Sequence, residues 1–249
     1  MDATSSSENS PRVLVTVCTY NEKENIAKLI PEIRRSLPIA HILVVDDNSP
    51  DGTADIVRQF SQTDPQVHLL LRLQKQGLGA ATIHGLKQGI DEGYDFLINM
   101  DADFSHPTAV LPQLLAAMDQ ADVAIGSRYV PGGGVSNWGY IRPFMSWGVN
   151  TYSRVLLGVK ARDCSGAYRC YRTSKLKEID FAKFRAKGYA FQEEILYRCA
   201  AVGCRFTEVP IVFENRTVGE SKINSKEVVR ALRDIALLGC DRLRGVSVR

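Results

Sequence analysis

Short apolar segments alternate with helical patterns along the first half of the chain, and this alternation restricts the fold more than any other feature. Apolar runs rich in β-branched residues occupy 13–18, 41–45, 67–71, 96–100 and 123–126. Between these runs, apolar residues recur at helical spacing over 25–35, 53–60, 79–89 and 108–118. Strands joined in this way by helices form parallel sheets with right-handed crossovers. The sequence therefore predicts an α/β fold, a mostly parallel sheet flanked by helices.

The alternation ends near residue 126, where a Gly-rich stretch, 130–139, predicts a long loop that closes over a substrate. Beyond it, helical spacing predicts helices over 145–157, 191–201 and 226–238. Strands are predicted at 166–171 and 207–215. No change in composition marks a second domain, and 249 residues are compatible with one.

Two carboxylates, Asp101 and Asp103, follow the strand predicted at 96–100. Open α/β sheets bind ligands at the carboxyl ends of their strands. Because one residue separates the two carboxylates, both can reach one hard cation, and oxygen ligands favour Mg²⁺ or Mn²⁺. The alternative is that Asp103 or Ser105 caps the next helix. An isolated Asp-x-Asp does not distinguish these two roles.

Polar residues also follow the first two strands, at Thr19–Glu22 and Asp46–Asp47. Parallel strands end at one edge, so we expect these clusters to lie near Asp101 and Asp103. Such a site suits a nucleotide, with Tyr20 flanking the base and Asp46 accepting hydrogen bonds from base or ribose. The pair Asp46–Asp47 also resembles the acidic pair of phosphorelay receiver domains, but in those domains the pair follows the first strand.

Basic residues follow the later strands. Arg128 comes after the strand predicted at 123–126, and Arg216 and Lys222 flank Gly219–Ser221. The planar guanidinium of arginine and the compact ammonium group of lysine both bind phosphate oxygens well. A single such residue is more often a solvated surface charge. Their shared position in Gly-rich loops at strand ends favours phosphate contacts.

Six motifs, in order, resemble those of the dolichol-phosphate (polyprenol-phosphate) mannose synthases over about residues 12–238. They are Thr19–Glu22, Val44–Thr53, Gly77–Gly79, Asp101–His106, Gly126–Tyr129 and Gly219–Lys222. The resemblance implies a single-domain glycosyltransferase-A fold with a Rossmann-like sheet. It also implies a metal-dependent, inverting transfer of mannose from GDP-mannose to the phosphate of a polyprenol or dolichol.

The resemblance further implies a site residue by residue. The residues that it places at the nucleotide sugar are Cys18, Tyr20, Glu22, Val44, Asp46, Asp101, Ala102, Asp103, Arg128, Arg216 and Lys222. Asp101 and Asp103 are the implied metal ligands, and Asp103, Arg128 and Lys222 the implied catalytic residues. Two positions depart from the family pattern. Cys18 replaces a frequent proline, and Ser105 stands where some relatives have a metal-binding glutamine, so the third protein ligand stays open.

Composition and the resemblance together suggest where the protein works. A net charge of +3 is too small to indicate nucleic-acid binding. No apolar run approaches the roughly 20 residues that cross a bilayer, and six cysteines without paired spacing predict reduced thiols. We expect a cytoplasmic protein, peripheral on the cytoplasmic face of a membrane, that can work with a small membrane-protein subunit. We also expect a disordered tail at 1–11, a catalytic domain at 12–225 and an amphipathic helix with a basic tail at 226–249.

An apolar stripe runs along the last predicted helix, through Val228, Val229, Leu232, Ile235 and Leu238. Arginines lie between and beyond these residues, which is typical of a helix that rests on an anionic membrane. A stripe packed on the protein's own core has the same periodicity. The resemblance favours membrane contact.

The acceptor determines whether a general base is needed. A phosphate monoester, with its second pKa near 6, is already a nucleophile at neutral pH. Glu193 and Glu194 are candidate bases for a sugar hydroxyl instead. The remaining alternatives are a UDP-glucose-dependent family 2 transferase and a non-catalytic nucleotide-sugar binder, and Asp101 and Asp103 argue against the second.

Overall fold

Strands form at all five apolar runs in the first half of the chain, and helices form between them. The computed structural model describes residues 10–74, 76–136, 141–186, 188, 190–214 and 225–245. The first strands are β1 (Val13–Thr19), β2 (Ala40–Asp46), β3 (Val67–Leu71), β4 (Phe96–Asp101) and β5 (Val123–Ser127). The connecting helices are α1 (Lys23–Ser36), α2 (Thr53–Thr63), α3 (Leu78–Asp91) and α4 (Leu111–Ala116), with the 3-10 turns η1 (Thr108–Val110) and η2 (Ala117–Asp119) around α4.

The second half adds shorter strands and two long helices. Its strands are β6 (Gly134–Val135), β7 (Arg169–Arg172), β8 (Phe206–Pro210) and β9 (Val212–Phe213). Its helices are α5 (Ile141–Leu157), α6 (Thr173–Leu176), the 3-10 turn η3 (Phe181–Lys183), α7 (Phe191–Ala201) and α8 (Ser225–Leu243). The expected tail at 1–11, except for residues 10 and 11, lies outside the described residues, as do Arg216 and Lys222.

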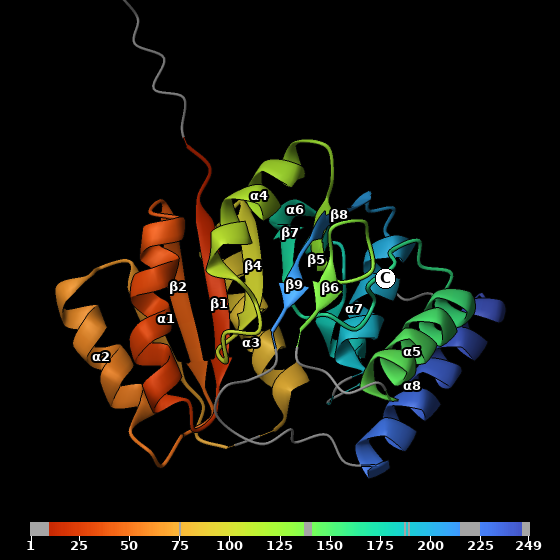
Figure 1. The fold of residues 1–249 in the computed structure, drawn as a ribbon, viewed down its shortest axis with the longest axis horizontal. Coiled ribbons are helices and arrows are strands. Elements are labelled where there is room, and N and C mark those ends of the chain that lie inside the picture. The colour runs from red at the N-terminus through yellow and green to blue at the C-terminus, as the bar shows by residue number, and fades with distance from the viewer. Residues whose placement is uncertain are drawn as a thin grey trace, which may run out of the picture.

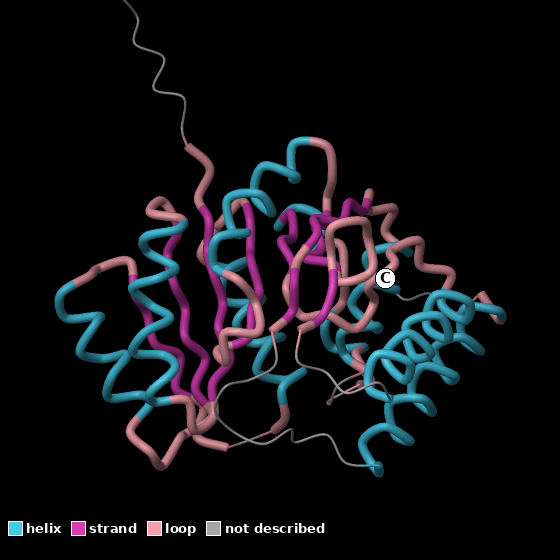
Figure 2. Tube along the Cα trace, viewed as in Figure 1, coloured by secondary structure: helices cyan, strands magenta, loops and turns pink. Residues whose placement is uncertain are grey.

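The main sheet has the strand order β3-β2-β1-β4-β7-β5-β8 (Figure 2). All neighbouring strands are parallel except β7, which runs antiparallel to both β4 and β5. Helices cover both faces, with α1, α2 and α4 in front of the sheet in Figure 1 and α3 behind it. The predicted mostly parallel α/β fold is therefore confirmed.

Alternate residues of the strands supply the two layers of the core. Val15 of β1 and Val44 of β2 pack with the apolar residues of α1 and α2. Leu14 and Val45 pack on the other face with residues of α3 and α7. A parallel sheet buried on both faces needs this continuous apolar sequence, which is why its strands read as runs rather than as alternations.

The strand predicted at 207–215 is interrupted, and its second part pairs with two residues of the Gly-rich stretch 130–139. Pro210 has no N–H to donate and ends β8, after which the Ile211 N–H donates to the carbonyl of Ser127 (3.0 Å). The chain then pairs as β9 with β6, where Gly134 N–H donates to the Ile211 carbonyl (2.9 Å). The expected substrate loop at 130–139 is thus held by a small parallel sheet as far as Ser136.

Helix α8 packs beside α5, and its apolar stripe is partly core. Ile235 and Leu238 are buried with the residues of the α3 and α7 face. The expectation that the whole stripe faces a membrane is therefore wrong at these two residues, because they complete the core. The part of the chain that the structure describes contains no helix that is both long enough and apolar enough to traverse a bilayer.

Candidate active site

The ends of β1, β2 and β4 lie side by side, as their sequence positions predict. Thr19 of β1 is in register with Asp46 of β2, and Cys18 is in register with Asp101 of β4. Val44 lies in β2 and Ala102 directly follows β4. The side chains of both are buried, so a ligand would meet their main chain instead. One edge of the sheet therefore carries the predicted residues of the first half of the chain.

Asp46 is fully buried and organises the loop that follows β2. Its carboxylate accepts hydrogen bonds from the Thr19 hydroxyl (2.8 Å), the Ser49 N–H (2.8 Å) and the Ser49 hydroxyl (2.6 Å). A buried carboxylate needs such donors to offset its desolvation. The hydrogen bonds of Asp46 therefore fix the shape of the β2–α2 loop.

The β1–α1 loop is bound to the β2–α2 loop by three hydrogen bonds. The N–H of Asn21 donates to the Ser49 hydroxyl (2.9 Å), and that of Glu22 donates to the Thr53 hydroxyl (3.1 Å). The third runs from the Lys23 N–H to the Asp51 carboxylate (3.1 Å). Asn21 holds a positive φ of 59°, a backbone conformation that asparagine tolerates. The half-buried Tyr20 and Glu22 are thereby fixed beside the strand ends.

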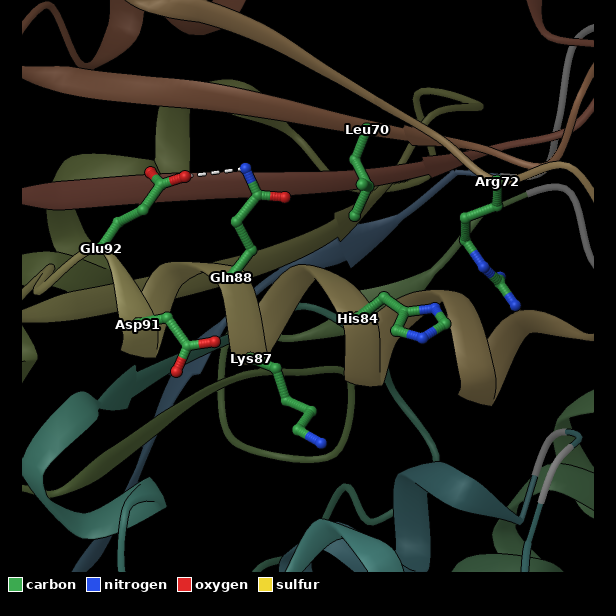
Figure 3. Close-up of a pocket in the computed structure, with 7 residues that line it drawn as sticks. All are labelled: Leu70, Arg72, His84, Lys87, Gln88, Asp91 and Glu92. Atoms are coloured by element: carbon green, nitrogen blue, oxygen red, sulfur yellow. Dashed lines mark hydrogen bonds between the residues drawn. The ribbon is translucent and has the colours of Figure 1, made fainter.

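Asp47 forms a buried ion pair with Arg72, with an Nη1–Oδ1 distance of 2.6 Å. Arg72 also lines a shallow groove of about 500 Å³ between β3 and α3 (Figure 3). Leu70 of β3 also lines the groove, and the other lining residues lie along α3 as far as Glu92, the residue after its end. None of the carboxylates predicted for the active site lines this groove, so it borders the site only through Arg72.

Asp101 and Asp103 lie where the sequence places them, and their neighbours hold both of them. The Ser105 hydroxyl (2.6 Å) and N–H (3.2 Å) both donate to Oδ1 of Asp103. Ser105 is fully buried, so it orients Asp103 rather than replacing a glutamine ligand. Phe104 between them has a positive φ of 61°, a costly conformation for an aromatic residue, which is typical of a functional loop.

His106 supports the other carboxylate. Its Nδ1 accepts the backbone N–H of Asp101 (2.9 Å), and its Nε2 lies 3.9 Å from the Asp101 carboxylate. The ring stacks on Tyr168, with 4.9 Å between centroids, and meets the edge of Phe213 at 5.8 Å. Burial lowers the pKa of His106, so the imidazole is neutral at pH 7 and can accept at Nδ1. His106 was not predicted as a site residue, because the sequence pattern shows no partner for it.

The donor set at this loop fits a hard divalent cation. Two carboxylates at one strand end supply anionic oxygens, and the Asp101 side chain is 29% exposed. Within the described ranges, no group of three or more His, Cys, Asp or Glu side chains has metal-binding geometry. A cation here would complete its coordination with ligand phosphate oxygens and water, which suits Mg²⁺ or Mn²⁺ better than a metal that needs a closed protein cage.

Cys18 lies beneath this edge as a neutral thiol. Its sulfur is 3.7 Å from the Thr82 hydroxyl of α3. Burial raises the pKa of the Cys18 thiol to about 12, which excludes a thiolate at physiological pH. The residue can therefore contribute packing and its main chain, and not a nucleophile.

The guanidinium of Arg128 is bound by the buried carboxylate of Asp163, so phosphate is not its first partner. Its Nε and Nη2 donate to the two oxygens of Asp163 (2.8 and 2.7 Å), and Nη2 also donates to the Ser165 hydroxyl (2.8 Å). Asp163 is fully buried and also accepts the Gly166 N–H (2.9 Å). Burial alone would raise the pKa of Asp163, but Arg128 and these N–H donors hold it below its usual value.

Asp163 and Ser165 were not among the predicted site residues. Asn150 of α5 holds their loop, since its side-chain Oδ1 accepts the N–H of Cys164 (2.7 Å) and of Ser165 (3.2 Å). The available signal was a polar Asp163–Gly166 segment directly before a strand. It went unused because the segment precedes β7 instead of following a parallel strand.

The two candidate bases on α7 have different environments. Glu194 is fully buried and binds Arg198 (2.6 Å), and it accepts the N–H groups of Arg185 and Ala186, so its role is structural. Glu193 is also buried, but its Oε2 has no hydrogen-bond partner, and neither has Nε of Arg169. Burial raises the pKa of Glu193 to about 7, and the nearby Arg169 only partly opposes this.

We expect Glu193→Gln to remove a pH dependence of stability. The folded-state pKa lies above the unfolded value of 4.5, so the contribution of Glu193 to stability is fully present below pH 4.5 and is lost as the pH rises through 7. The variant should be up to about 3 kcal/mol more stable than the wild type at pH 8, and similar to it at pH 4.5. Urea unfolding at both pH values measures this, with the exposed Glu24→Gln as the control. A wild type and variant with the same pH slope would contradict the assignment.

The α/β sheet with an Asp-x-Asp pair at the end of a central strand defines a glycosyltransferase of the A-type fold. The chain belongs to glycosyl transferase family 2, whose model matches residues 14–180.

Two full-length relatives have a named activity. An undecaprenyl-phosphate mannosyltransferase of Micrococcus luteus is 43% identical over 239 residues, which cover 96% of this chain and 98% of the relative. A polyprenol monophosphomannose synthase of Mycolicibacterium smegmatis is 44% identical over 241 residues, covering 94% and 91%. The relatives therefore belong to the group that the six sequence motifs indicate.

Solved structures support the fold. Mannosyl-3-phosphoglycerate synthase from Rubrobacter xylanophilus superposes with a TM-score of 0.67 at 17% identity, over 94% of this chain and 75% of that one. Glucosyl-3-phosphoglycerate synthase from Mycobacterium tuberculosis gives 0.67 at 15% identity, over 96% and 81%, in a complex with Mn²⁺, UDP and glucosyl-3-phosphoglycerate. At these identities the likeness concerns the fold alone.

Proposed function

We propose that this protein transfers mannose from GDP-mannose to a polyprenyl or dolichyl phosphate, with inversion and with Mg²⁺ or Mn²⁺. The observation that carries the proposal is the position of Asp101 and Asp103, beside the fixed loop of Tyr20 and Glu22. The two full-length mannosyltransferase relatives support the choice of sugar and of lipid phosphate acceptor.

In this proposal Asp101 and Asp103 hold the cation, while Ser105 and His106 fix their orientation. The bound cation supplies Lewis-acid stabilisation to the leaving diphosphate. Tyr20, Glu22 and Asp46 shape the nucleotide site, together with the main chain at Cys18, Val44 and Ala102. The hydrogen bonds that join the β1–α1 loop to the β2–α2 loop fix these residues before the donor binds, which reduces the loss of freedom on binding.

The reaction needs no general base when the acceptor is a phosphate. A phosphate oxygen of the lipid attacks the anomeric carbon of mannose from the side opposite the diphosphate. The bond from that carbon to the diphosphate oxygen breaks, and its electron pair leaves with GDP, so the configuration inverts. No proton has to move, because the acceptor is already ionised at neutral pH.

Basic residues would reduce the repulsion between acceptor phosphate and donor diphosphate. Arg128 contributes from a fixed position, since Asp163 and Ser165 hold its guanidinium. Arg216 and Lys222, outside the described residues, are proposed to bind phosphate oxygens directly. The catalytic domain is proposed to span 12–225, and the reaction to take place on the cytoplasmic face of a membrane, with or without a small membrane-protein subunit.

Donor choice tests this function. With polyprenyl phosphate and Mg²⁺ or Mn²⁺, we expect label from GDP-mannose to enter a lipid product at least about 100-fold faster than label from UDP-glucose, because a site that pairs its polar groups with one base rejects another strongly. Separation of the labelled lipid by chromatography measures both rates. Preferred use of UDP-glucose would identify a glucosyltransferase of the same family, and binding of GDP-mannose without any transfer would indicate a non-catalytic binder.

A further inference from the structure

The side chain of Phe213 lies between two charged parts of the candidate active site. Its ring packs edge-to-face with the imidazole of His106, with 5.8 Å between the ring centroids. On another side, the guanidinium carbon of Arg128 lies 5.5 Å from the centroid of the Phe213 ring. Phe213 is the second residue of β9 and is half-buried. None of the six sequence motifs includes it.

His106 belongs to the half of the site that would hold the cation. Its Nδ1 accepts the N–H of Asp101 (2.9 Å), and Tyr168 stacks on its ring. Burial has the largest effect on the pKa of His106 and lowers it. Four charged groups also act on this pKa, and they are Asp101, Asp103, Arg128 and Asp163. The imidazole therefore lies between the two metal-side carboxylates and the Arg128–Asp163 ion pair.

Arg128 belongs to the half of the site that would face the acceptor phosphate. Asp163 and Ser165 bind the edge of its guanidinium by hydrogen bonds. The guanidinium carbon also lies over two aromatic rings, 5.3 Å from the centroid of Tyr129 and 5.5 Å from that of Phe213. An aromatic ring attracts a guanidinium held over its face. Hydrogen bonds and ring contacts together therefore fix this group.

The main chain of Phe213 also holds part of the Gly-rich stretch 130–139. Phe213 is in register with Val135 of β6, and its carbonyl accepts the N–H of Ser136 (2.9 Å). The two short strands lie side by side near the centre of the molecule (Figure 1). One residue therefore joins three parts of the site, which are the Gly-rich stretch, the cation side and the phosphate side.

We propose that Phe213 is a positioning residue, which fixes the guanidinium of Arg128 relative to the carboxylates of Asp101 and Asp103. The proposal rests on the proposed function, in which an acceptor phosphate and a leaving diphosphate stand in line on opposite sides of the anomeric carbon. A displacement of about 1 Å from such an arrangement can cost about 100-fold in rate. Phe213 acts through His106 and Arg128, so its loss should slow transfer and leave donor binding nearly unchanged.

Steady-state transfer by Phe213→Leu, with GDP-mannose, Mn²⁺ and polyprenyl phosphate, tests the proposal. Its kcat should fall at least about tenfold. Its KM for GDP-mannose, and its affinity for Mn²⁺ with GDP followed by electron paramagnetic resonance, should stay within about twofold of the wild type. Phe213→Tyr keeps the ring and should restore kcat to the wild-type range. Val212→Leu changes the exposed neighbour on the same strand and, as the matched control, should alter none of these values.

A second measurement reports on the same positioning without turnover. The Nε–H of Arg128 donates to Asp163, so it should exchange slowly with water in the wild type, as ¹⁵N nuclear magnetic resonance can measure. Exchange should be faster in Phe213→Leu and unchanged in Phe213→Tyr and Val212→Leu. If Phe213→Leu does not fold, Phe213→Met, which also lacks the ring, takes its place with the same expectations.

A wild-type kcat in Phe213→Leu would overturn the proposal, and so would an equal loss of kcat in Phe213→Tyr. Unchanged exchange of the Arg128 Nε–H in Phe213→Leu would overturn it even if transfer were lost. If the wild type transferred no mannose but the exchange pattern were as expected, the positioning by Phe213 would be supported and only the proposed function contradicted.

Discussion

Asp103→Asn should lower the rate of mannose transfer by at least about 1,000-fold while the protein stays folded. Charge compensation at the leaving diphosphate contributes several kcal/mol, and about 4 kcal/mol corresponds to this factor. Asparagine keeps an oxygen that can accept from the Ser105 hydroxyl and N–H, so the loop should keep its shape. The change therefore removes the negative charge with little effect on packing.

Two measurements check this expectation, the transfer rate and the binding of Mn²⁺ with GDP followed by electron paramagnetic resonance. Both should be lost in Asp103→Asn, with the melting temperature close to that of the wild type. Asp119→Asn, an exposed aspartate beyond α4, is the matched control and should change neither. Full Mn²⁺ binding in Asp103→Asn would show that this carboxylate is not a metal ligand.

Arg128→Ala should destabilise the fold by about 3–5 kcal/mol at pH 7, because it leaves the buried carboxylate of Asp163 without its bidentate partner. The loss should shrink toward pH 4, since an unpaired buried carboxylate has a raised pKa and is protonated there. Transfer should also fall, because a charge that compensates the meeting phosphates is gone. Chemical unfolding at both pH values measures the first effect.

A second variant separates stability from catalysis. Arg128→Ala/Asp163→Asn carries no unpaired charge, and the asparagine can still accept the Gly166 N–H, so it should recover most of the lost stability. It should not recover transfer. If the double variant regained both, Arg128 would act only on the fold, and if the single variant were as stable as the wild type, the ion pair would not be the buried structure described above.

The strands of the first half of the chain were predictable because they belong to a sheet that is buried on both faces. Apolar runs such as β1 (Val13–Thr19) are typical of strands in a parallel sheet, and the carboxylates at the ends of β2 and β4 fall at one edge. The placement of β7 was not predictable. A strand was predicted at 166–171 and β7 forms at Arg169–Arg172, but only the finished sheet shows that it inserts antiparallel between β4 and β5.

Side-chain partners were the other part that sequence patterns could not supply. Arg128 was expected to engage phosphates, and the sequence did not indicate its partner Asp163, which lies 35 residues further along the chain. The periodicity of α8 predicted an apolar stripe, but a stripe packed on core and one resting on lipid have the same spacing. Only the folded structure shows that Ile235 and Leu238 join the core residues of α3, α5 and α7 and are buried.

Acceptor choice is the most direct test of the central claim, that a lipid phosphate takes mannose from a nucleotide held at Asp101 and Asp103. Purified full-length protein is incubated with labelled GDP-mannose, Mg²⁺ or Mn²⁺, and either polyprenyl phosphate or the matching polyprenol without phosphate. The account predicts a labelled lipid from polyprenyl phosphate only, and none when the cation is removed with EDTA. Equal transfer to the polyprenol would contradict it, because that reaction requires a general base and not an acceptor phosphate.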